Sequence, residues 1–560
     1  MSVDIVWPKV TTGLALLGFS LAAQAAPPVI PGAGTIIQEV EPVTPPAPSP
    51  SGTGLSIQES QGSSLPATTP FRVNTLHITG STVFNEPTLH ALVANGEGKD
   101  LTLAGLSELA ARVTDYYHEH GYPLARAILP AQVIRDGVVN IQVIEARYDK
   151  VSLDNRSRVR DSLLLATVSP LQGGQLITQS SLDHSLLLLS DIPGVIVSAT
   201  LKPGDAVGTS ALQVSTTAGP LVTGDLTLDN YGDRYTGDVR GGGTVNLIDP
   251  LHQGDVLSGS ILSSGSGLND GRLGYDALLD GVGTRAGASY STLHYILGDS
   301  LSALDGSGIA QVGSLWVKQP FVRTATVNLY GQIEFDHKRL HDDLAASDIR
   351  TDRHLNNWTA SLAGDWRDGL LAGGVNSWNL SATSGQLGFD NDSAQLADAA
   401  TARTQGHFTK STASFARLQS LGPKDAIYIA LSSQWASGNL DSAEKLVAGG
   451  PYSVRAYAVG ALSGDTGYLG SLEYRHEFGQ FAGHWQGIAF VDSERADINR
   501  SPWAPGDNSA TLSGAGMGVN WTGPDRWLVK ACVAAPIGAT PVQVGSTDSA
   551  RVWVEINKGF

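Results

Sequence analysis

The sequence of 560 residues is poor in cysteine and in basic residues. Its one cysteine, Cys532, has no partner for an intrachain disulfide. It lies in a short apolar run with no histidine nearby, which indicates a small apolar strand residue and not a catalytic thiol. With 36 Lys and Arg against 53 Asp and Glu, the formal net charge is −17. Because no basic face is left to neutralise phosphates, we expect no nucleic acid partner.

Long apolar runs are also missing. A membrane-spanning helix needs about 20 consecutive apolar residues, and no stretch of the chain supplies them. Ser185 to Ala199 comes nearest, but Asp191-Ile-Pro-Gly194 interrupts it. If the chain enters a membrane, it must do so as a closed β-barrel, the other structure that satisfies backbone polar groups in lipid.

The amino terminus has the layout of a signal peptide. Lys9 provides a positive charge, Gly13 to Ala23 a short apolar core, and Ala23-Gln24-Ala25 a small-x-small cleavage pattern. The core is too short for a membrane anchor. These features predict a signal peptide over residues 1–25 and export of the chain.

A linker rich in Pro, Ser, Thr and Gly follows over residues 26–70. Its run Pro45-Pro-Ala-Pro-Ser-Pro50 favours an extended, polyproline-like backbone. Within the linker, Gly34 to Glu41 could form a short amphipathic turn of helix. Most of the segment is expected to be a plain linker.

Residues 71–147 and 148–219 are predicted to form two small α+β units in tandem. In the first, strand, helix, helix and hairpin follow one another, with Asp136-Gly137 as the hairpin turn. The second repeats this order weakly. The predicted elements are Arg72–Thr79, Pro87–Ala94, a helix through Leu103 to Tyr117, Ala125–Val133 and Val138–Ile144, then helices Val159–Thr167 and Gln179–Ser190 and strands Val195–Leu201 and Ser210–Thr216.

From residue 220 to residue 560, period-2 alternation replaces helical periodicity. Tyr468, Leu472 and Phe478, for example, alternate with Glu473 and Arg475. A soluble sandwich shows the same period, so alternation alone does not separate the two folds. The signal peptide, the length of the strand-like region and a terminal aromatic residue together favour a transmembrane antiparallel β-barrel over residues 220–560.

The last strand has two distinct faces. Val552, Val554, Ile556 and Phe560 lie on one face, and Arg551, Trp553, Glu555 and Asn557 lie on the other. In a barrel the first face meets lipid and the second meets the lumen. We therefore expect this strand to close the barrel, with Phe560 as a C-terminal barrel signal.

A series of short motifs runs through both units and into the strand-rich region. These are Gly121-Tyr-Pro123, Leu129-Pro-Ala-Gln132, Asp136-Gly137, Ile141–Glu145, Asp191–Val195, Leu201–Gly204, Gly208–Val214, Asp229–Gly232, Asn246–Pro250 and Gly254-Asp255. Each is weak alone, but their order and spacing resemble the two-partner secretion outer-membrane transporters of the ShlB/FhaC/HecB type, relatives of the barrel-assembly proteins. This resemblance implies two POTRA domains, over residues 71–147 and 148–219, and a sixteen-stranded barrel.

Two further motifs suggest where transport is controlled. Val454-Arg455-Ala456-Tyr457 resembles the tip of the loop that folds back into the barrel of this family, with Ala456 in place of a Gly. The segment from Phe490 through Asp492 resembles the Phe-x-Asp-x-Gly motif of a barrel-wall strand, with Glu494 in place of the final Gly.

An arginine inside a lumen needs an anionic partner, because a buried unpaired charge is unfavourable. Asp492 on an inward-facing wall position is the expected partner of Arg455. Glu473 and Glu477 are alternatives. The residues alone favour a different interpretation, with Arg455 on an exposed loop and Asp492 in a turn, because most charged residues are solvated. The family resemblance favours the pair inside the barrel.

The resemblance implies a protein-translocating pore in the outer membrane of a Gram-negative bacterium, with the POTRA domains in the periplasm. Its partners would be a secreted exoprotein captured unfolded, of the haemolysin, adhesin or contact-dependent toxin type, outer-membrane lipid, and the barrel-assembly machinery during insertion. Family members can hold an N-terminal helix in the pore, and Gly34 to Glu41 is the candidate for such a plug. The alternative is an assembly factor that inserts other barrels.

An enzyme or a passive porin fits less well. No Gly-x-Ser-x-Gly is present, and Gly241-Gly-Gly243 lacks the Lys-Ser/Thr of a phosphate loop. His118 and His120 do not share a helix face, so no metal site is expected there. A passive porin has no need of residues 71–219. We expect no catalytic residue, no cofactor and no metal.

Overall fold

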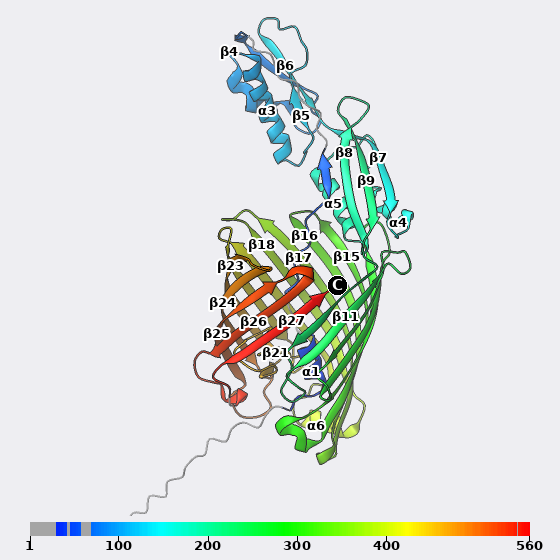
Figure 1. Ribbon diagram of the computed structural model, residues 1–560, viewed down its shortest axis with the longest axis vertical. Helices are drawn as coiled ribbons and strands as arrows, with labels where there is room; N and C mark the ends of the chain where they lie inside the picture. The colour runs from blue at the N-terminus through cyan, green and yellow to red at the C-terminus, as the bar shows by residue number, and fades with distance from the viewer. Residues whose placement is uncertain (1–29, 42–44, 58–68, 546) are drawn as a thin grey trace, which may run out of the picture.

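The computed structural model describes residues 30–41, 45–57, 69–545 and 547–560. The signal peptide predicted over residues 1–25 lies outside these ranges, as does part of the linker predicted over residues 26–70. In the described residues, two small α+β units stand in line on one end of a large β-barrel (Figure 1).

The barrel is a closed sheet of sixteen strands, in which neighbours in the sequence pair antiparallel. It closes where β27 pairs with β10 in the register Thr227↔Asn557. The one step in the order is from β20 to β23, because β21 and β22 form a separate hairpin. The barrel strands are β10 (Val222–Asp229), β11 (Arg240–Ile248), β12 (Val256–Ser263), β13 (Leu268–Leu278), β14 (Arg285–Ile296), β15 (Gly306–Arg323), β16 (Val327–Leu344), β17 (Ile349–Asp368), β18 (Gly374–Phe389), β19 (Gly406–Ser420), β20 (Asp425–Ala436), β23 (Thr466–Gln480), β24 (His484–Asp497), β25 (Ser509–Thr522), β26 (Trp527–Pro536) and β27 (Arg551–Gly559).

The alternation in the sequence arises from the two faces of these strands. On β23, Leu472 is 51% exposed on the outer face, whereas its neighbour Glu473 is 7% exposed on the inner face. On β27, Val552 is exposed and Trp553 is buried. An apolar outer face and a polar inner face suit a sheet between lipid and a wet lumen. The predicted antiparallel barrel of sixteen strands is confirmed.

The first α+β unit contains β2 (Phe71–Val73), β3 (Thr75–Thr79), α2 (Glu86–Val93), β4 (Lys99–Leu101), α3 (Leu103–Glu119), β5 (Arg126–Ile128) and β6 (Val138–Ile144). The single strand expected over Arg72–Thr79 is wrong. At Asn74, whose N–H donates to Gly137 O, the chain leaves the β2–β4 pair and enters the β3-β6-β5 sheet. The strand expected over Ala125–Val133 is only three residues long; Pro130, which has no N–H to give to a ladder, lies beyond its end.

The second unit contains β7 (Arg147–Arg156), α4 (Asp161–Val168), α5 (Gln179–Ser190), β8 (Val195–Pro203) and β9 (Thr209–Ala218). Its sheet has the order β1-β8-β9-β7, and β7 was not located from the sequence. The strand β1 (Leu55–Ile57) comes from the linker and pairs in parallel with β8. The linker is therefore part of this unit's sheet.

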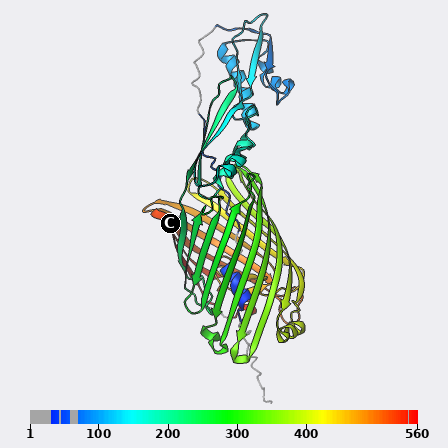
Figure 2. The same ribbon diagram turned by 90° about the vertical axis from the view of Figure 1, so that its right-hand side faces the viewer.

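One helix, α1 (Ala33–Val40), lies inside the barrel, where it is seen in blue (Figures 1 and 2). Ile36 and Ile37 pack in a cluster with inward-facing residues of the wall such as Leu340 and Leu355. The helix predicted over Gly34 to Glu41 is thus present, shifted by one residue. In the described residues the remaining helix of the barrel region, α6 (Asp392–Ala400), and all others are too short or too polar to cross a membrane.

A buried carboxylate joins three parts of the first unit. Glu145 accepts hydrogen bonds from the backbone N–H groups of Thr82 and Val83 at 2.7 and 2.9 Å, and from the Tyr117 hydroxyl at 2.9 Å. Burial alone would raise the pKa of Glu145, but these donors outweigh it and lower the pKa below its ordinary value.

A lowered folded-state pKa means that this contribution to stability is complete above the unfolded value of about 4.3 and is lost as the pH falls through the folded value. We expect Glu145→Gln to destabilise the first unit by about 1–3 kcal/mol at pH 7, because buried donors lose their acceptor. Hydrogen-exchange mass spectrometry over residues 81–84 and α3 measures this. Below pH 4 the difference between wild type and variant should shrink; an equal difference at pH 7 and pH 3 contradicts it.

Candidate functional site

The chain between β20 and β23 folds inward against the barrel wall. It carries the hairpin of β21 (Leu446–Ala448) and β22 (Leu462–Gly464), and the residues between these two strands form a compact turn. Val454, Ala456 and Tyr457 are buried in one cluster with Phe490 and Leu512 of the wall. Gly449 has a φ of +94°, and a Cβ there would lie 2.2 Å from Ala458 O. Only glycine allows the chain to turn at this point.

Arg455 is the charged centre of this inward segment. Its guanidinium donates to both oxygens of Asp492, at 2.7 and 2.8 Å, and to Glu473 Oε1 at 2.7 Å. The same group lies 3.4 Å from the centroid of the Phe490 ring. Asp492 is fully buried on β24, and Glu473 projects inward from β23. The planar fork of arginine suits this two-pronged contact, which lysine cannot reproduce.

The cluster is balanced in charge. Glu473 also receives Arg475, whose Nη2 lies 2.6 Å from Glu473 Oε2. Asp492, Arg455, Glu473 and Arg475 therefore alternate in sign. A charge buried without a partner is strongly unfavourable, so each of these groups depends on its neighbours. Glu477, an alternative partner considered from the sequence, instead accepts from Gln486 at 2.7 Å.

The last barrel strand holds the same segment. Trp553 on β27 is buried, and its indole N–H donates to the backbone carbonyl of Arg455 at 2.7 Å. The inward segment thus contacts β23, β24 and β27, which are among the last strands of the barrel in sequence order. Phe560 itself is 47% exposed and hydrogen bonds through its backbone with Gly224.

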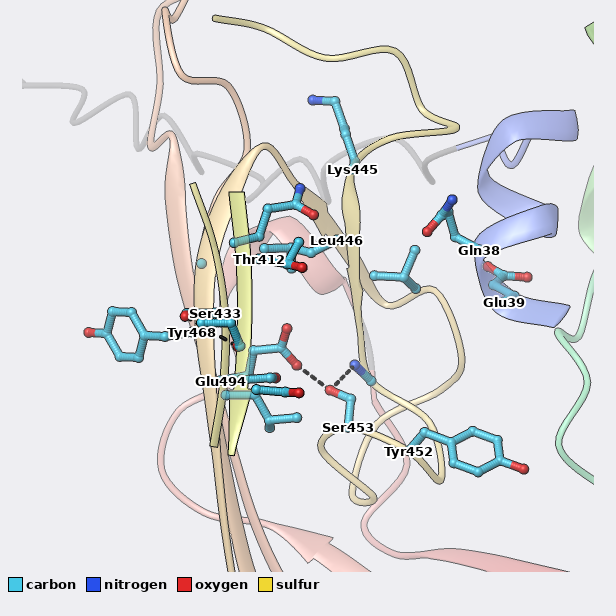
Figure 3. A pocket seen from close by; sticks show the side chains of 18 of the residues that line it. Gln38, Glu39, Thr412, Ser433, Lys445, Leu446, Tyr452, Ser453, Tyr468 and Glu494 are labelled. Carbon is cyan, nitrogen blue, oxygen red and sulfur yellow. Dashed lines mark hydrogen bonds between the residues drawn. The ribbon is translucent and has the colours of Figure 1, made fainter. Parts of the chain in front are cut away.

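Glu494 is a second point of attachment that the sequence did not reveal. It is buried on β24 and accepts a hydrogen bond from the Ser453 hydroxyl, which in turn accepts from the N–H of Gly449 (Figure 3). Among the described residues, no cation lies within ion-pair distance of Glu494. Its only sequence signal is its place two residues after Asp492 on the same strand face.

Ala456 lies where the family motif has glycine, and a glycine on the barrel wall leaves space for its methyl group. Gly514 on β25 faces it, and a Cβ at Gly514 would lie 2.4 Å from the Ala456 Cβ. The extra methyl group of Ala456 therefore fills space that glycine leaves open on the wall. Tyr457 is 1% exposed next to it.

The helix α1 is held in the lumen by a separate set of contacts. The N–H of Ala33 donates to Asp342 Oδ1 at 2.7 Å, at the positive end of the helix. Asp342 also receives Arg353 at 2.6 Å, and Arg353 reaches Asp441 of the inward segment at 2.7 Å. A Cβ at Gly34 would lie 2.5 Å from the Ala443 backbone nitrogen, so the helix and the inward segment touch backbone to backbone.

The pocket in Figure 3 lies between these two elements and the wall. Gln38 and Glu39 of α1 lie on one side of it, and Ser453, Glu494 and Tyr468 on the other. Gln38 donates to Ala443 O at 2.7 Å. The helix and the inward segment together occupy the middle of the barrel, and the wall surrounds them.

Other residues weighed from the sequence lie elsewhere. His118 contacts the backbone carbonyl of Ala125 at 2.9 Å, and His120 contacts that of Tyr116 in α3 at 2.7 Å. In the part of the chain that the structure describes, no group of three or more His, Cys, Asp or Glu side chains is arranged to hold a metal ion. Cys532 lies half-buried on β26.

Two family models match the chain. The POTRA domain of the ShlB type matches residues 71–146, and the haemolysin secretion/activation protein ShlB/FhaC/HecB matches residues 208–521. The chain belongs to this ShlB/FhaC/HecB family. The family resemblance inferred from the motifs is confirmed.

Curated relatives agree with this family. The transporter is 26% identical over 479 residues to the heme/hemopexin transporter protein HuxB of Haemophilus influenzae, covering 84% of this chain and 83% of the relative. It is 24% identical over 472 residues to the outer membrane transporter CdiB of Escherichia coli, covering 81% and 76%. It is therefore an outer-membrane transporter of the two-partner secretion type, as expected.

Solved structures show the same fold. The structure of CdiB from Escherichia coli matches with a TM-score of 0.67 at 22% identity, covering 93% of this chain and 95% of that one. BamA from Haemophilus ducreyi, without its first three POTRA domains, matches with a TM-score of 0.52 at 14% identity, covering 88% and 100%. The barrel-assembly protein thus shares the architecture.

We expect Arg455→Ala to release the inward segment while the barrel still inserts. The change leaves Asp492 and Glu473 buried without a cation, which costs about 3–5 kcal/mol of docking free energy. Hydrogen exchange and protease cleavage over residues 449–460 measure the release, and the amount of exported exoprotein measures its effect. The control is Arg495→Ala, which removes an exposed arginine from β24, the strand that carries Asp492. Unchanged protection and normal export in Arg455→Ala would show that the cluster is dispensable.

Proposed function

We propose that the transporter captures an unfolded exoprotein with its two α+β units and exports it through the barrel once α1 and the inward segment have moved. The single observation that carries this proposal is that both elements fill the lumen and are held there by polar contacts to the wall. Arg455 with Asp492, and Ala33 with Asp342, are the principal ones. Hydrogen bonds and ion pairs can exchange for water as the lumen opens, whereas the apolar contacts that Ile36, Ile37 and Val454 also make with the wall have to be broken.

In this proposal the chain divides as the motifs indicate. Residues 1–25 are a signal peptide, 26–70 a linker with a plug helix, 71–147 and 148–219 the POTRA domains, and 220–560 the barrel. In this family the POTRA domains are periplasmic, and the barrel lies in the outer membrane. Phe560 next to the closing strand serves recognition by the barrel-assembly machinery, and the exposed apolar belt meets lipid.

Val454, Arg455, Ala456 and Tyr457, with Phe490 and Asp492, form the site that controls transport. The chemistry is protein translocation, with no catalytic residue, metal or cofactor. Two relatives suggest two cargo classes, one connected with heme/hemopexin as for HuxB and one like the partner of CdiB, and the greater identity and coverage of HuxB favours the first. The architecture shared with BamA keeps barrel insertion as the competing activity.

Co-expression separates export from barrel insertion. The transporter is produced in a Gram-negative host together with a large, repeat-rich exported protein encoded in a neighbouring reading frame. We expect that protein in the medium, and its retention in the periplasm when residues 71–219 are removed from a barrel that still inserts. Undiminished export without these units, or a loss of other outer-membrane barrels when the intact transporter is depleted, contradicts the proposal.

The plug role of α1 has its own test. We expect Asp342→Ala to raise single-channel conductance in a planar bilayer, because the helix loses the acceptor at its amino terminus and Arg353 loses a partner. The matched control is Asp343→Ala, which removes the adjacent carboxylate that pairs only with the exposed Arg350. Equal conductance for wild type and Asp342→Ala means that α1 does not block the pore.

A further inference from the structure

The outer edge of β8 is covered by a segment of the chain's own linker. The residues of β1 pair in parallel with β8 in the register Leu55↔Ala199, Ser56↔Thr200 and Ile57↔Leu201. The N–H of Ala199 donates to the carbonyl of Gly54 at 3.0 Å. Strand β1 spans three residues and β8 spans nine, so the cover is short.

Packing retains this cover only weakly. Leu55 contacts the core of the second unit, whereas Ser56 and Ile57 are exposed. The approach depends on Gly54, which has a φ of +62° and whose Cβ would lie 2.6 Å from Val197 O. A strand held by three residue pairs and one apolar side chain can exchange with a competing strand.

The edge beneath β1 lacks the usual protection against strand pairing. Exposed edges are normally blunted by charges, bulges or proline. Along β8 the charged and proline residues, Lys202 and Pro203, stand only at its end, and the covered stretch is Ala199 to Leu201. Such an edge accepts an extended segment through backbone hydrogen bonds, which require little of its sequence.

The linker connects this edge to the mouth of the barrel. Arg323 donates to Pro50 O at 2.8 Å and pairs with Asp191 of the second unit at 2.6 Å. The hydroxyl of Ser49 donates to Asp365 of the wall at 2.6 Å. Leu55 comes five positions after Pro50, a reach of at most about 18 Å at 3.3–3.6 Å per residue. A chain that occupies the edge of β8 therefore displaces a part of the linker that is only a few residues from the segment leading back to α1.

We propose that the edge of β8 is the binding site for an extended segment of the exoprotein, which replaces β1. The replacing segment is uncharged where it lies along Ala199 to Leu201, and it places an apolar side chain at the position of Leu55. In the absence of cargo β1 occupies the site as a substitute ligand. This inference rests on the proposed function and names the edge through which capture occurs.

A reversible disulfide tests the exchange. In a Cys532→Ala parent, Ser56→Cys with Thr200→Cys locks β1 onto β8 under oxidising conditions, since the Ser56 and Thr200 hydroxyls are 3.2 Å apart. We expect loss of export in proportion to the crosslinked fraction, and recovery with reductant. The control is Ile196→Cys with Thr217→Cys, which links β8 to its permanent neighbour β9 at a paired position. It should export normally in both states.

A second variant acts in the opposite direction. Gly54→Val prevents the close approach of β1, and the urea-unfolded exoprotein, diluted onto the detergent-solubilised transporter, should bind more tightly than to wild type. The control is Gly52→Val, where a Cβ meets nothing within 4 Å. Normal export by the locked variant together with unchanged binding by Gly54→Val overturns the inference and leaves the proposed function standing. If the unaltered transporter exports no exoprotein, the proposed function fails, and the inference fails with it.

Discussion

The guanidinium of Arg455 is the interaction on which the interior of the barrel depends. It lies between Asp492 and Glu473, and it can remain inside the wall only because both carboxylates are there. The two carboxylates lie at inward positions of adjacent strands, and they would repel each other without the guanidinium of Arg455. The inward segment and the wall therefore stabilise each other. Without its partner, either the arginine of the segment or the two carboxylates of the wall would be buried unpaired.

The same rule organises the rest of the lumen. Glu444 of the inward segment is buried and receives Lys338 and Lys410 from the wall, each at 2.7 Å. Asp342 of the wall binds the amino terminus of α1 and Arg353 together. The closed sheet has no free edge strand, because β27 pairs with β10. In the proposed function the segments inside the barrel move during transport, and polar contacts to the wall are part of what holds them.

The sequence predicted the features that repeat and missed those that depend on distant partners. Period-2 alternation located the barrel and the faces of β27, because lipid and lumen impose opposite polarity on adjacent residues. The amphipathic stretch from Gly34 located α1. Strand β7 was missed because its register shifts between Tyr148 and Val151, which interrupts the alternation, and β1 is too short at three residues to show a period. The contact from Trp553 to Arg455 joins residues 98 positions apart, which no local pattern encodes.

The linker is held at two places that differ in strength, and in the proposed exchange this difference sets an order of release. At Ser49 and Pro50 its backbone and hydroxyl meet Arg323, Asp365 and Arg367, with Arg323 wholly buried. Hydrogen bonds to charged groups are about twice as strong as neutral ones. Strand β1 has only neutral contacts, which are backbone pairing over three residues and the hydrogen bonds of the Ser56 hydroxyl. Because β1 is the weaker attachment and lies on the side of the α+β units, it is the first that an arriving chain meets and the first that it can displace. The anchor at the mouth of the barrel then remains to be broken before α1 can leave, so capture and opening are separate steps.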